Sequence, residues 1–223
     1  MIKKVGYIHV ITGVLWLSVL LFGSAAQAID YVQMDVAELD QKIKNLKLGF
    51  EDYRLSFKLT ESQKATAEKN KIKDSFAGTY KFRDNDVYVV ADKKTDKILA
   101  VYIQDDNADK KQFQLMVSSL MMEFGEPTTM AHDKLIYWAY NGDGVIGQEL
   151  YQAMRKANNL DILATVKFSS KVSIAEVTDK DSGNTVNKDG NHRVVEKEEE
   201  NKNLIYCIVS SPPVLKRYIA AKQ

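Results

Sequence analysis

Residues 106–141, DNADKKQFQLMVSSLMMEFGEPTTMAHDKLIYWAYN, contain the two patterns that decide the fold. The first part predicts a helix, because its large apolar residues recur at spacings of three and four: Phe113, Met116, Val117, Leu120, Met121 and Phe124. Asp106 or Asn107 is expected to cap the first turn. Gly125 and Pro127 should end the helix, since glycine tolerates a left-handed backbone and proline cannot continue a helix.

The second part of this stretch predicts a strand. Residues 135–140 are a dense run of aromatic and aliphatic side chains, Leu-Ile-Tyr-Trp-Ala-Tyr, which suits a pleated, half-buried surface. The run stops at Asn141-Gly142-Asp143-Gly144, a typical turn composition. The central unit of the chain is therefore expected to be a helix, a tight stop and a strand.

The first 28 residues have the layout of a secretory signal peptide. Lys3 and Lys4 form a basic start, residues 5–22 are mostly apolar, and Ala26-Gln27-Ala28 is a small-x-small cleavage site. We therefore expect residues 1–28 to be a signal peptide and the protein to be periplasmic or secreted. The alternative is a retained membrane anchor, in which case this segment would make the protein's only membrane contact.

The net charge and the cysteine count limit the kinds of partner and the cellular compartment that we expect. Removing residues 1–28 takes away two lysines and no acid, which leaves 29 basic and 30 acidic residues and a net charge of −1. A nucleic-acid partner would require a concentrated basic face, so none is expected. Cys207 is the only cysteine, so no intramolecular disulfide can form. These features suit a bacterial periplasm or the cell exterior.

The order of patterns predicts an α+β fold in which helices pack on one face of antiparallel sheet. Residues 36–46 and 146–157 have helical periodicity, as does the C-terminal segment 214–222. Strands are expected at residues 53–59, 79–82, 87–90, 98–103, 135–140, 160–168, 172–177 and 204–209. The order suggests two tandem helix-plus-sheet halves, residues 29–105 and 106–223.

Two polar segments interrupt these patterns. Residues 61–73 are rich in lysine and predict an exposed helix or a mobile loop. Residues 178–203 contain almost no apolar side chain beyond three valines, which predicts a polar insertion, either a solvated hairpin tip or a disordered loop.

A helix closed by Gly125-Glu126-Pro127 and followed by Trp138-Ala139-Tyr140 on a strand resembles the small envelope module of the outer-membrane assembly lipoprotein BamE (small protein A). The same layout is similar to the β-lactamase-inhibitor proteins, which are built from tandem helix-plus-sheet units. Residues 46–50, Leu-Lys-Leu-Gly-Phe, resemble the glycine-containing turn near the start of such modules. The resemblance covers about 40 residues well. It implies a binding or scaffolding role without catalysis.

No pattern marks an active site. Cys207 could in principle pair with His132 or His192, but its apolar neighbours predict a buried structural thiol. Asp105-x-Asn107-x-Asp109 begins like a calcium loop, yet Lys110 stands where the glycine is needed. No phosphate-binding or hydrolase motif occurs. We therefore expect no catalytic residue, no metal site and no cofactor.

Three aromatic residues are the candidate binding site. Alternation places Trp138 and Tyr140 on one side of their strand and Tyr137 on the other, and one of these sides is expected to be core. Aromatic side chains on an open side would be good interface anchors. The favoured function is an exported, non-enzymatic protein that binds a protein partner in the envelope or outside the cell through its sheet. The alternatives are a hydrolase with an unrecognised cleft and a small-ligand carrier.

Overall fold

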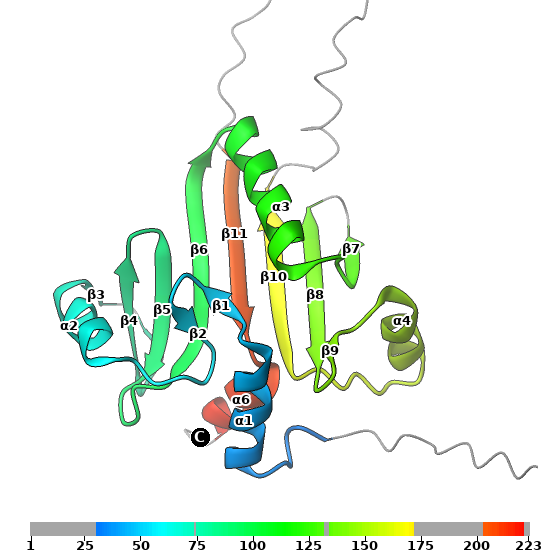
Figure 1. Ribbon diagram of the computed structural model, residues 1–223, viewed down its shortest axis with the longest axis horizontal. Helices are drawn as coiled ribbons and strands as arrows, with labels where there is room; N and C mark the ends of the chain where they lie inside the picture. Colours follow the sequence, from blue (N-terminus) through cyan, green and yellow to red (C-terminus); the bar gives the residue numbers. More distant parts are fainter. Residues whose placement is uncertain (1–29, 74, 132–133, 172–202, 221–223) are drawn as a thin grey trace, which may run out of the picture.

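The predicted α+β class is confirmed by a computed structural model, which describes residues 30–73, 75–131, 134–171 and 203–220 (Figure 1). Within those residues one nine-stranded antiparallel sheet runs in the order β3-β4-β5-β6-β11-β10-β8-β7, and β9 pairs with β8. A separate hairpin joins β1 and β2. None of the helices in this part of the chain is long and apolar enough to cross a membrane.

The strands and helices have the following bounds. The strands are β1 (Gly49–Phe50), β2 (Tyr53–Arg54), β3 (Lys71–Ile72), β4 (Thr79–Asp84), β5 (Val87–Asp92), β6 (Ile98–Ala108), β7 (Thr129–Ala131), β8 (Leu135–Asn141), β9 (Gly144–Val145), β10 (Ala164–Ser170) and β11 (Asn203–Ser210). The helices are α1 (Val36–Leu46), α2 (Glu61–Lys69), α3 (Lys110–Phe124), α4 (Gln148–Lys156) and α6 (Pro212–Ala220).

The pairing of β6 with β11 joins the early and late strands into one sheet. Val101 lies opposite Val209, and Ile103 lies opposite Cys207. β6 continues to Ala108, so the boundary predicted between residues 105 and 106 falls inside this strand. The division into two halves stays a prediction about the chain, but the two sets of strands share one sheet.

The core lies on one face of the sheet, under α1, the β1–β2 hairpin and α3 (Figure 1). Helix α1 buries Leu39 and Ile43. Phe113 of α3 packs edge-on against Phe168 of β10, with ring centroids 5.6 Å apart. Helices α2 and α4 lie beside the two edges of the sheet (Figure 1). The helix predicted at residues 146–157 is thus present as α4, but it buries none of its residues.

Helix α3 begins later than predicted, so the proposed caps at Asp106 and Asn107 are wrong. Asp109 caps the helix: its carboxylate accepts from the Gln112 backbone at 2.7 Å, and the Gln112 amide oxygen accepts from the Asp109 backbone at 2.8 Å. Asp106 and Asn107 cannot cap the helix because they belong to β6, which stays paired as far as Ala108. The predicted stop is correct, because Gly125 is the C-cap with φ +76°.

The strand predicted at residues 53–59 is mostly absent. Only Tyr53 and Arg54 form β2, and Ser56 has φ +63°, which breaks an extended chain. Leu55 and Leu59 are buried as the alternation implied, but Phe57 is 42% exposed. These side chains therefore reach the core from an irregular segment. Alternation of apolar and polar residues does not by itself require a strand.

Other strand predictions differ in their limits. The strand predicted at 160–168 starts only at Ala164, and the strand predicted at 204–209 is β11, an interior strand between β6 and β10. Residues 61–69 form α2, the helical alternative for that polar segment. The signal peptide, the strand predicted at 172–177 and all but the last residue of the predicted insertion lie outside the described residues.

A single arginine ties the two ends of the described chain together. The Arg217 side chain of α6 donates through Nε to the carbonyl of Val32 at 2.7 Å and through Nη2 to the carbonyl of Tyr31 at 2.9 Å, and it also bonds the Met34 carbonyl. The Tyr31 hydroxyl in turn accepts from the Gly142 backbone at 2.9 Å. The first turn is thereby fixed to both α6 and the end of β8.

Candidate functional site

Trp138, one of the three predicted binding residues, lies in the core. Its side chain is 0% exposed and contacts the Phe124 ring of α3 at a centroid distance of 5.9 Å. Its indole Nε1 donates to the carbonyl of Gly125 at 2.9 Å. This bond explains how an indole can be fully buried without leaving its donor unsatisfied. Trp138 therefore fixes the end of α3 to β8.

Tyr140 lies on the same side of β8 as Trp138, as alternation predicts, and is 7% exposed. Burial raises the pKa of its phenol to about 12, because a phenolate would be poorly solvated there. Both residues therefore present no free aromatic surface in this conformation. A binding role for them stays a prediction.

Tyr137 lies on the opposite face of β8. It pairs with Lys167 of β10, and its half-buried ring is 6.1 Å from the ring of Tyr151 in α4. Desolvation raises its pKa to about 12, so the hydroxyl stays a neutral hydrogen-bonding group at ordinary pH. Of the three predicted residues, Tyr137 is the one on the face away from α3.

That face carries a row of tyrosines from three neighbouring strands. Tyr88 of β5 and Tyr102 of β6 are directly paired, and their rings stack at 4.7 Å with an interplanar angle of 4°. Tyr206 of β11 continues the row, with its ring 5.3 Å from that of Tyr102. All three rings are half-buried, and desolvation raises the pKa of Tyr102 to about 12.

A fixed cation lies at one end of this row. The guanidinium of Arg83 is 5.2 Å from the centre of the Tyr88 ring, within the range of a cation–π contact. Arg83 is held there because it also donates to the carbonyl of Asn85 at 2.7 Å and to the carboxylate of Asp86 at 3.2 Å. Arg83, Tyr88, Tyr102 and Tyr206 are here called the tyrosine face.

The tyrosine face is on the side of the sheet that α3 does not cover. The neighbours of Tyr206 in β11, Ile205 and Cys207, are buried on the α3 side, and Cys207 pairs with Phe168, which contacts α3. Successive side chains of a strand point to opposite faces, so Tyr206 and Tyr102 point away from α3. The surface is aromatic, and the phenol hydroxyls provide its polar groups.

Sequence reasoning missed the tyrosine face, although each strand carried a signal. Tyr88 and Tyr206 each lie between two buried aliphatic or thiol side chains, and Tyr102 lies between buried Val101 and partly buried Ile103. This alternation is typical of the wetter face of a strand. Their alignment depends on the pairing of β5, β6 and β11, and residues 102 and 206 are too far apart in sequence for periodicity to relate them.

The described residues offer little for catalysis. Cys207 is 0% exposed, and burial raises the pKa of its thiol far above the ordinary value, which opposes formation of a nucleophilic thiolate. His132 and His192 lie outside the described residues. In the part of the chain that the structure describes, no group of three or more His, Cys, Asp or Glu side chains could hold a metal ion.

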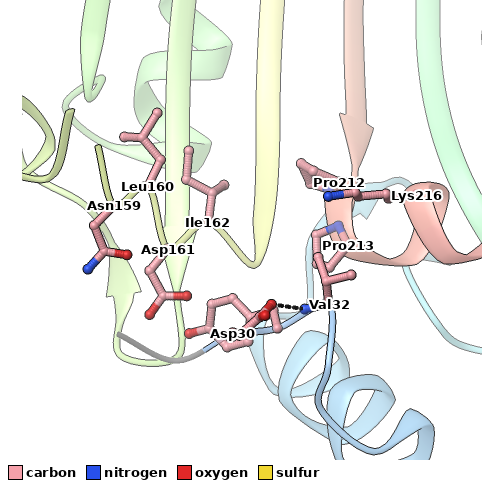
Figure 2. A pocket seen from close by; sticks show the side chains of 10 residues that line it. Asp30, Val32, Asn159, Leu160, Asp161, Ile162, Pro212, Pro213 and Lys216 are labelled. Carbon is pink, nitrogen blue, oxygen red and sulfur yellow. Dashed lines mark hydrogen bonds between the residues drawn. The ribbon is translucent and has the colours of Figure 1, made fainter. Parts of the chain in front are cut away.

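A cleft of about 430 Å³ lies where residues 30–32, residues 159–162 and the start of α6 meet (Figure 2). Its volume would suit a small molecule. Asp30 and Asp161 are the acids of its lining, and Lys216 is the base. The Asp30 carboxylate already accepts from the Val32 backbone at 2.9 Å, which stabilises the local turn. The walls otherwise include apolar side chains such as Leu160 and Ile162.

Comparison with protein-family models, curated proteins and solved structures finds no match to this chain. The resemblance to BamE-like modules therefore stays a prediction that depends on residues 106–141 and 46–50 alone.

Proposed function

We propose that this protein is an exported, non-enzymatic binding or scaffolding protein of the bacterial envelope, which recognises a protein partner through the tyrosine face of its sheet. Export follows from the signal-peptide pattern of residues 1–28. The observation that carries the binding role is the stacked row of Tyr88, Tyr102 and Tyr206 on the face of the sheet opposite α3.

Tyrosine and arginine suit such a role for physical reasons. A tyrosine ring gives a large contact area at a low cost in conformational entropy, and its hydroxyl forms hydrogen bonds at the edge of the contact. Both residue types are enriched among side chains that dominate binding energy. Stacking on its neighbours and the contact with Arg83 hold Tyr88 in place before a partner arrives, so little ordering remains to be done on binding.

The face is a better candidate than the sheet edges. A partner that added a strand would need a row of free backbone groups, but the outer strands β3 and β7 contain only two and three residues. The basic groups Arg83 and Lys167, together with uncharged phenols, favour a partner surface with carboxylates and apolar or aromatic side chains.

Capture of partners from the native envelope tests this proposal. Wild-type protein and Tyr102→Ala would be used as baits, with mass spectrometry of the bound proteins and a titration of the principal one. Tyr102→Ala should weaken that partner's binding by at least about tenfold, as expected for a central interface aromatic. Val36→Ala is the matched control, because Val36 is 59% exposed on α1, on the other side of the sheet.

Equal capture by wild type and Tyr102→Ala, with Tyr102→Ala still folded by circular dichroism, would reject the tyrosine face. The rival functions give different results. A small-ligand carrier would retain ligand in native mass spectrometry, and substitution of Leu160 in the cleft by a larger side chain would reduce it. A hydrolase would turn over ester, peptide or glycoside probes.

A further inference from the structure

The cleft shown in Figure 2 lies directly beside the predicted signal-peptide cleavage site. Asp30, the second residue after Ala28, forms part of its wall. Cleavage after Ala28 would make Ile29 the first residue of the mature chain and turn its peptide nitrogen into a free α-ammonium group. Consecutive Cα atoms are about 3.8 Å apart, so this group would begin beside the wall that Asp30 forms.

The chain that follows this position is held firmly. The carbonyl of Asp30 accepts from the backbone of Met34 at 3.2 Å, which closes a turn. Tyr31 is 4% exposed, and its hydroxyl accepts from the Gly142 backbone at 2.9 Å. The carbonyl of Tyr31 accepts from Arg217 at 2.9 Å. The point from which the mature chain would begin is therefore fixed relative to the cleft.

The charges of the cleft suit one additional cation. Its lining contains the acids Asp30 and Asp161 and the base Lys216, so one further positive charge would balance it. Lys216 is exposed and screened by water, whereas Asp161 is half-buried. Figure 2 shows the Asp161 carboxylate turned toward Asp30. Burial first, and then the negative charge of Asp161, raise the pKa of the Tyr31 phenol, so this carboxylate acts directly on the fixed turn.

The apolar walls of the cleft suit the side chain that would arrive with this cation. Leu160 and Ile162 contribute to the lining, and Leu160 is 47% exposed. Ile29 has a branched aliphatic side chain, and covering Leu160 with it would remove apolar surface from water. The cleft volume of about 430 Å³ is ample for one such residue. An amino-terminal isoleucine therefore matches the cleft in charge and in polarity.

We propose that this cleft receives the amino terminus that signal-peptide cleavage creates at Ile29, and that the new α-ammonium group forms an ion pair with Asp161. This role of the cleft rests on the export that is part of the proposed function. Before cleavage the nitrogen of residue 29 belongs to a neutral peptide bond, so the ion pair can form only after processing. Removal of the signal peptide thus also completes the folded structure at the junction of residues 30–32, residues 159–162 and α6.

Titration of the amino terminus tests this proposal. The full chain is expressed with export in a bacterial host, and the intact mass shows whether the exported protein begins at Ile29. Its α-amino group is then labelled by reductive ¹³C-methylation and titrated by NMR. The midpoint should lie at least about one pH unit above the ordinary value of about 8, because a nearby carboxylate favours the ammonium form. Asp161→Asn should return the midpoint to the ordinary value. Asp106→Asn is the matched control, since it removes the same charge from an exposed position on β6, and it should leave the midpoint unchanged.

The titratable and charged groups that face the proposed position from the three walls of the cleft are Asp30, Tyr31, Asp161 and Lys216, and Asp143 acts on Tyr31 from the turn after β8.

Displacement of the ammonium group gives a second measure. Insertion of Gly-Ser-Gly between Ala28 and Ile29 of the full chain keeps every native side chain but moves the new amino terminus away from the cleft. Asp161→Asn should lower the melting temperature by about 2–4 °C more in the protein that begins at Ile29 than in the insertion variant, a shift typical of one charge-assisted contact in a chain of this size. Damage that the asparagine causes by itself is common to both backgrounds and cancels.

Three results would overturn the proposal. They are an α-amino group that titrates at the ordinary value, a midpoint that Asp161→Asn leaves unchanged, and equal losses of melting temperature in the two backgrounds. Binding of n-butylamine that Asp161→Asn abolishes, together with an ordinary midpoint, would overturn it in favour of a small organic cation from outside.

Failure of this proposal and failure of the proposed function give different results. An intact mass that retains residues 1–28 would overturn the proposal together with the predicted cleavage. An ordinary midpoint in a chain that begins at Ile29 would overturn the proposal alone and leave export intact. Partner capture through Tyr102 can succeed or fail independently of every result here.

Discussion

Trp138 combines two roles that are usually separate, because it fills the core and also bonds to the stop of a helix. Its ring is 0% exposed, and its Nε1 donor is satisfied by the carbonyl of Gly125. We predict that Trp138→Ala lowers the free energy of unfolding by about 3–5 kcal/mol through loss of packing and a new cavity. Urea denaturation followed by circular dichroism measures the loss.

Tyr137→Ala is the natural control for that measurement, because Tyr137 lies next in sequence but on the opposite, half-buried face. Tyr137→Ala should lower the free energy of unfolding clearly less than Trp138→Ala does. If Trp138→Ala cost less than about 1 kcal/mol, the core contact between β8 and α3 would not contribute as its burial implies.

Tyr140 should make stability depend on pH in the alkaline range. Its folded pKa is raised to about 12 by burial, against about 10 for a tyrosine in the unfolded chain. The folded state therefore favours the neutral phenol. The stability that this preference gives is fully present below about pH 10 and is lost as the pH rises through about 12.

We therefore predict that Tyr140→Phe loses less stability than wild type between about pH 8 and about pH 12, by up to about 2–3 kcal/mol. Urea denaturation at several pH values gives the two curves. Tyr102 and Tyr137 also have pKa values raised to about 12, so the variant should flatten the curve without abolishing its fall. Parallel curves for the two proteins would contradict the assignment.

Residue placement could be predicted only within a strand. Alternation separates Trp138 and Tyr140 from Tyr137, and the structure agrees. It does not say which neighbours each side chain meets across the sheet. Tyr102 contacts Tyr88 and Tyr206 because of strand pairings, one of which joins residues about a hundred positions apart. Local sequence patterns contain no such information.

At the scale of elements, the start of α3 gives a direct test of what fixes a helix end. Asp109 forms a reciprocal cap with Gln112, whereas Asp106 belongs to β6 and accepts from the side-chain amide of Gln104 at 2.8 Å. We predict that Asp109→Ala costs about 1 kcal/mol of stability, a typical value for a lost cap. Thermal and urea unfolding provide the measurement.

Asp106→Ala serves as the comparison, since it removes the same charge three residues away, and it should change stability by less than about 0.5 kcal/mol. Equal losses for the two variants would show that the negative charge near the helix start matters more than the hydrogen bonds of the cap.

Elements that two independent sequence patterns indicate could be predicted. Elements that one pattern indicates could not. Helix α3 has a long apolar period and a glycine stop, and β8 has dense aromatics and an Asn-Gly stop. In residues 53–59 the alternation of apolar and polar residues is the single pattern that indicates a strand. Ser56 breaks that strand with φ +63°, a conformation that a serine at this position does not predict. The start of α3 was missed because β6 pairs further than its apolar run extends.

For the whole molecule, the decisive feature is the pairing of β6 with β11, two strands that are far apart in the sequence. β11 pairs with β6 on one side and with β10 on the other, so the last strand occupies the centre of the sheet. The apolar character of β11 on both faces predicted an interior strand, but no local pattern could identify its neighbours. The pairing of β11 with β6 therefore joins the early and late strands in one sheet.

Arg217 links the two ends of the described chain. One guanidinium bonds the carbonyls of Tyr31, Val32 and Met34, and the Tyr31 hydroxyl then accepts the Gly142 amide. We predict that Arg217→Ala lowers the free energy of unfolding by about 2–3 kcal/mol, since charge-assisted bonds to three partly buried carbonyls are lost together. Urea denaturation measures this change.

A local measurement tests the coupling itself. In Arg217→Ala the first turn should loosen, so hydrogen exchange at the Gly142 amide should accelerate, although that amide does not touch Arg217. Lys216→Ala, which removes an exposed cation from the neighbouring position of α6, should leave both stability and exchange nearly unchanged. Faster exchange in Lys216→Ala as well would point to fraying of α6. Unchanged exchange in Arg217→Ala would mean that Tyr31 stays in place without the guanidinium.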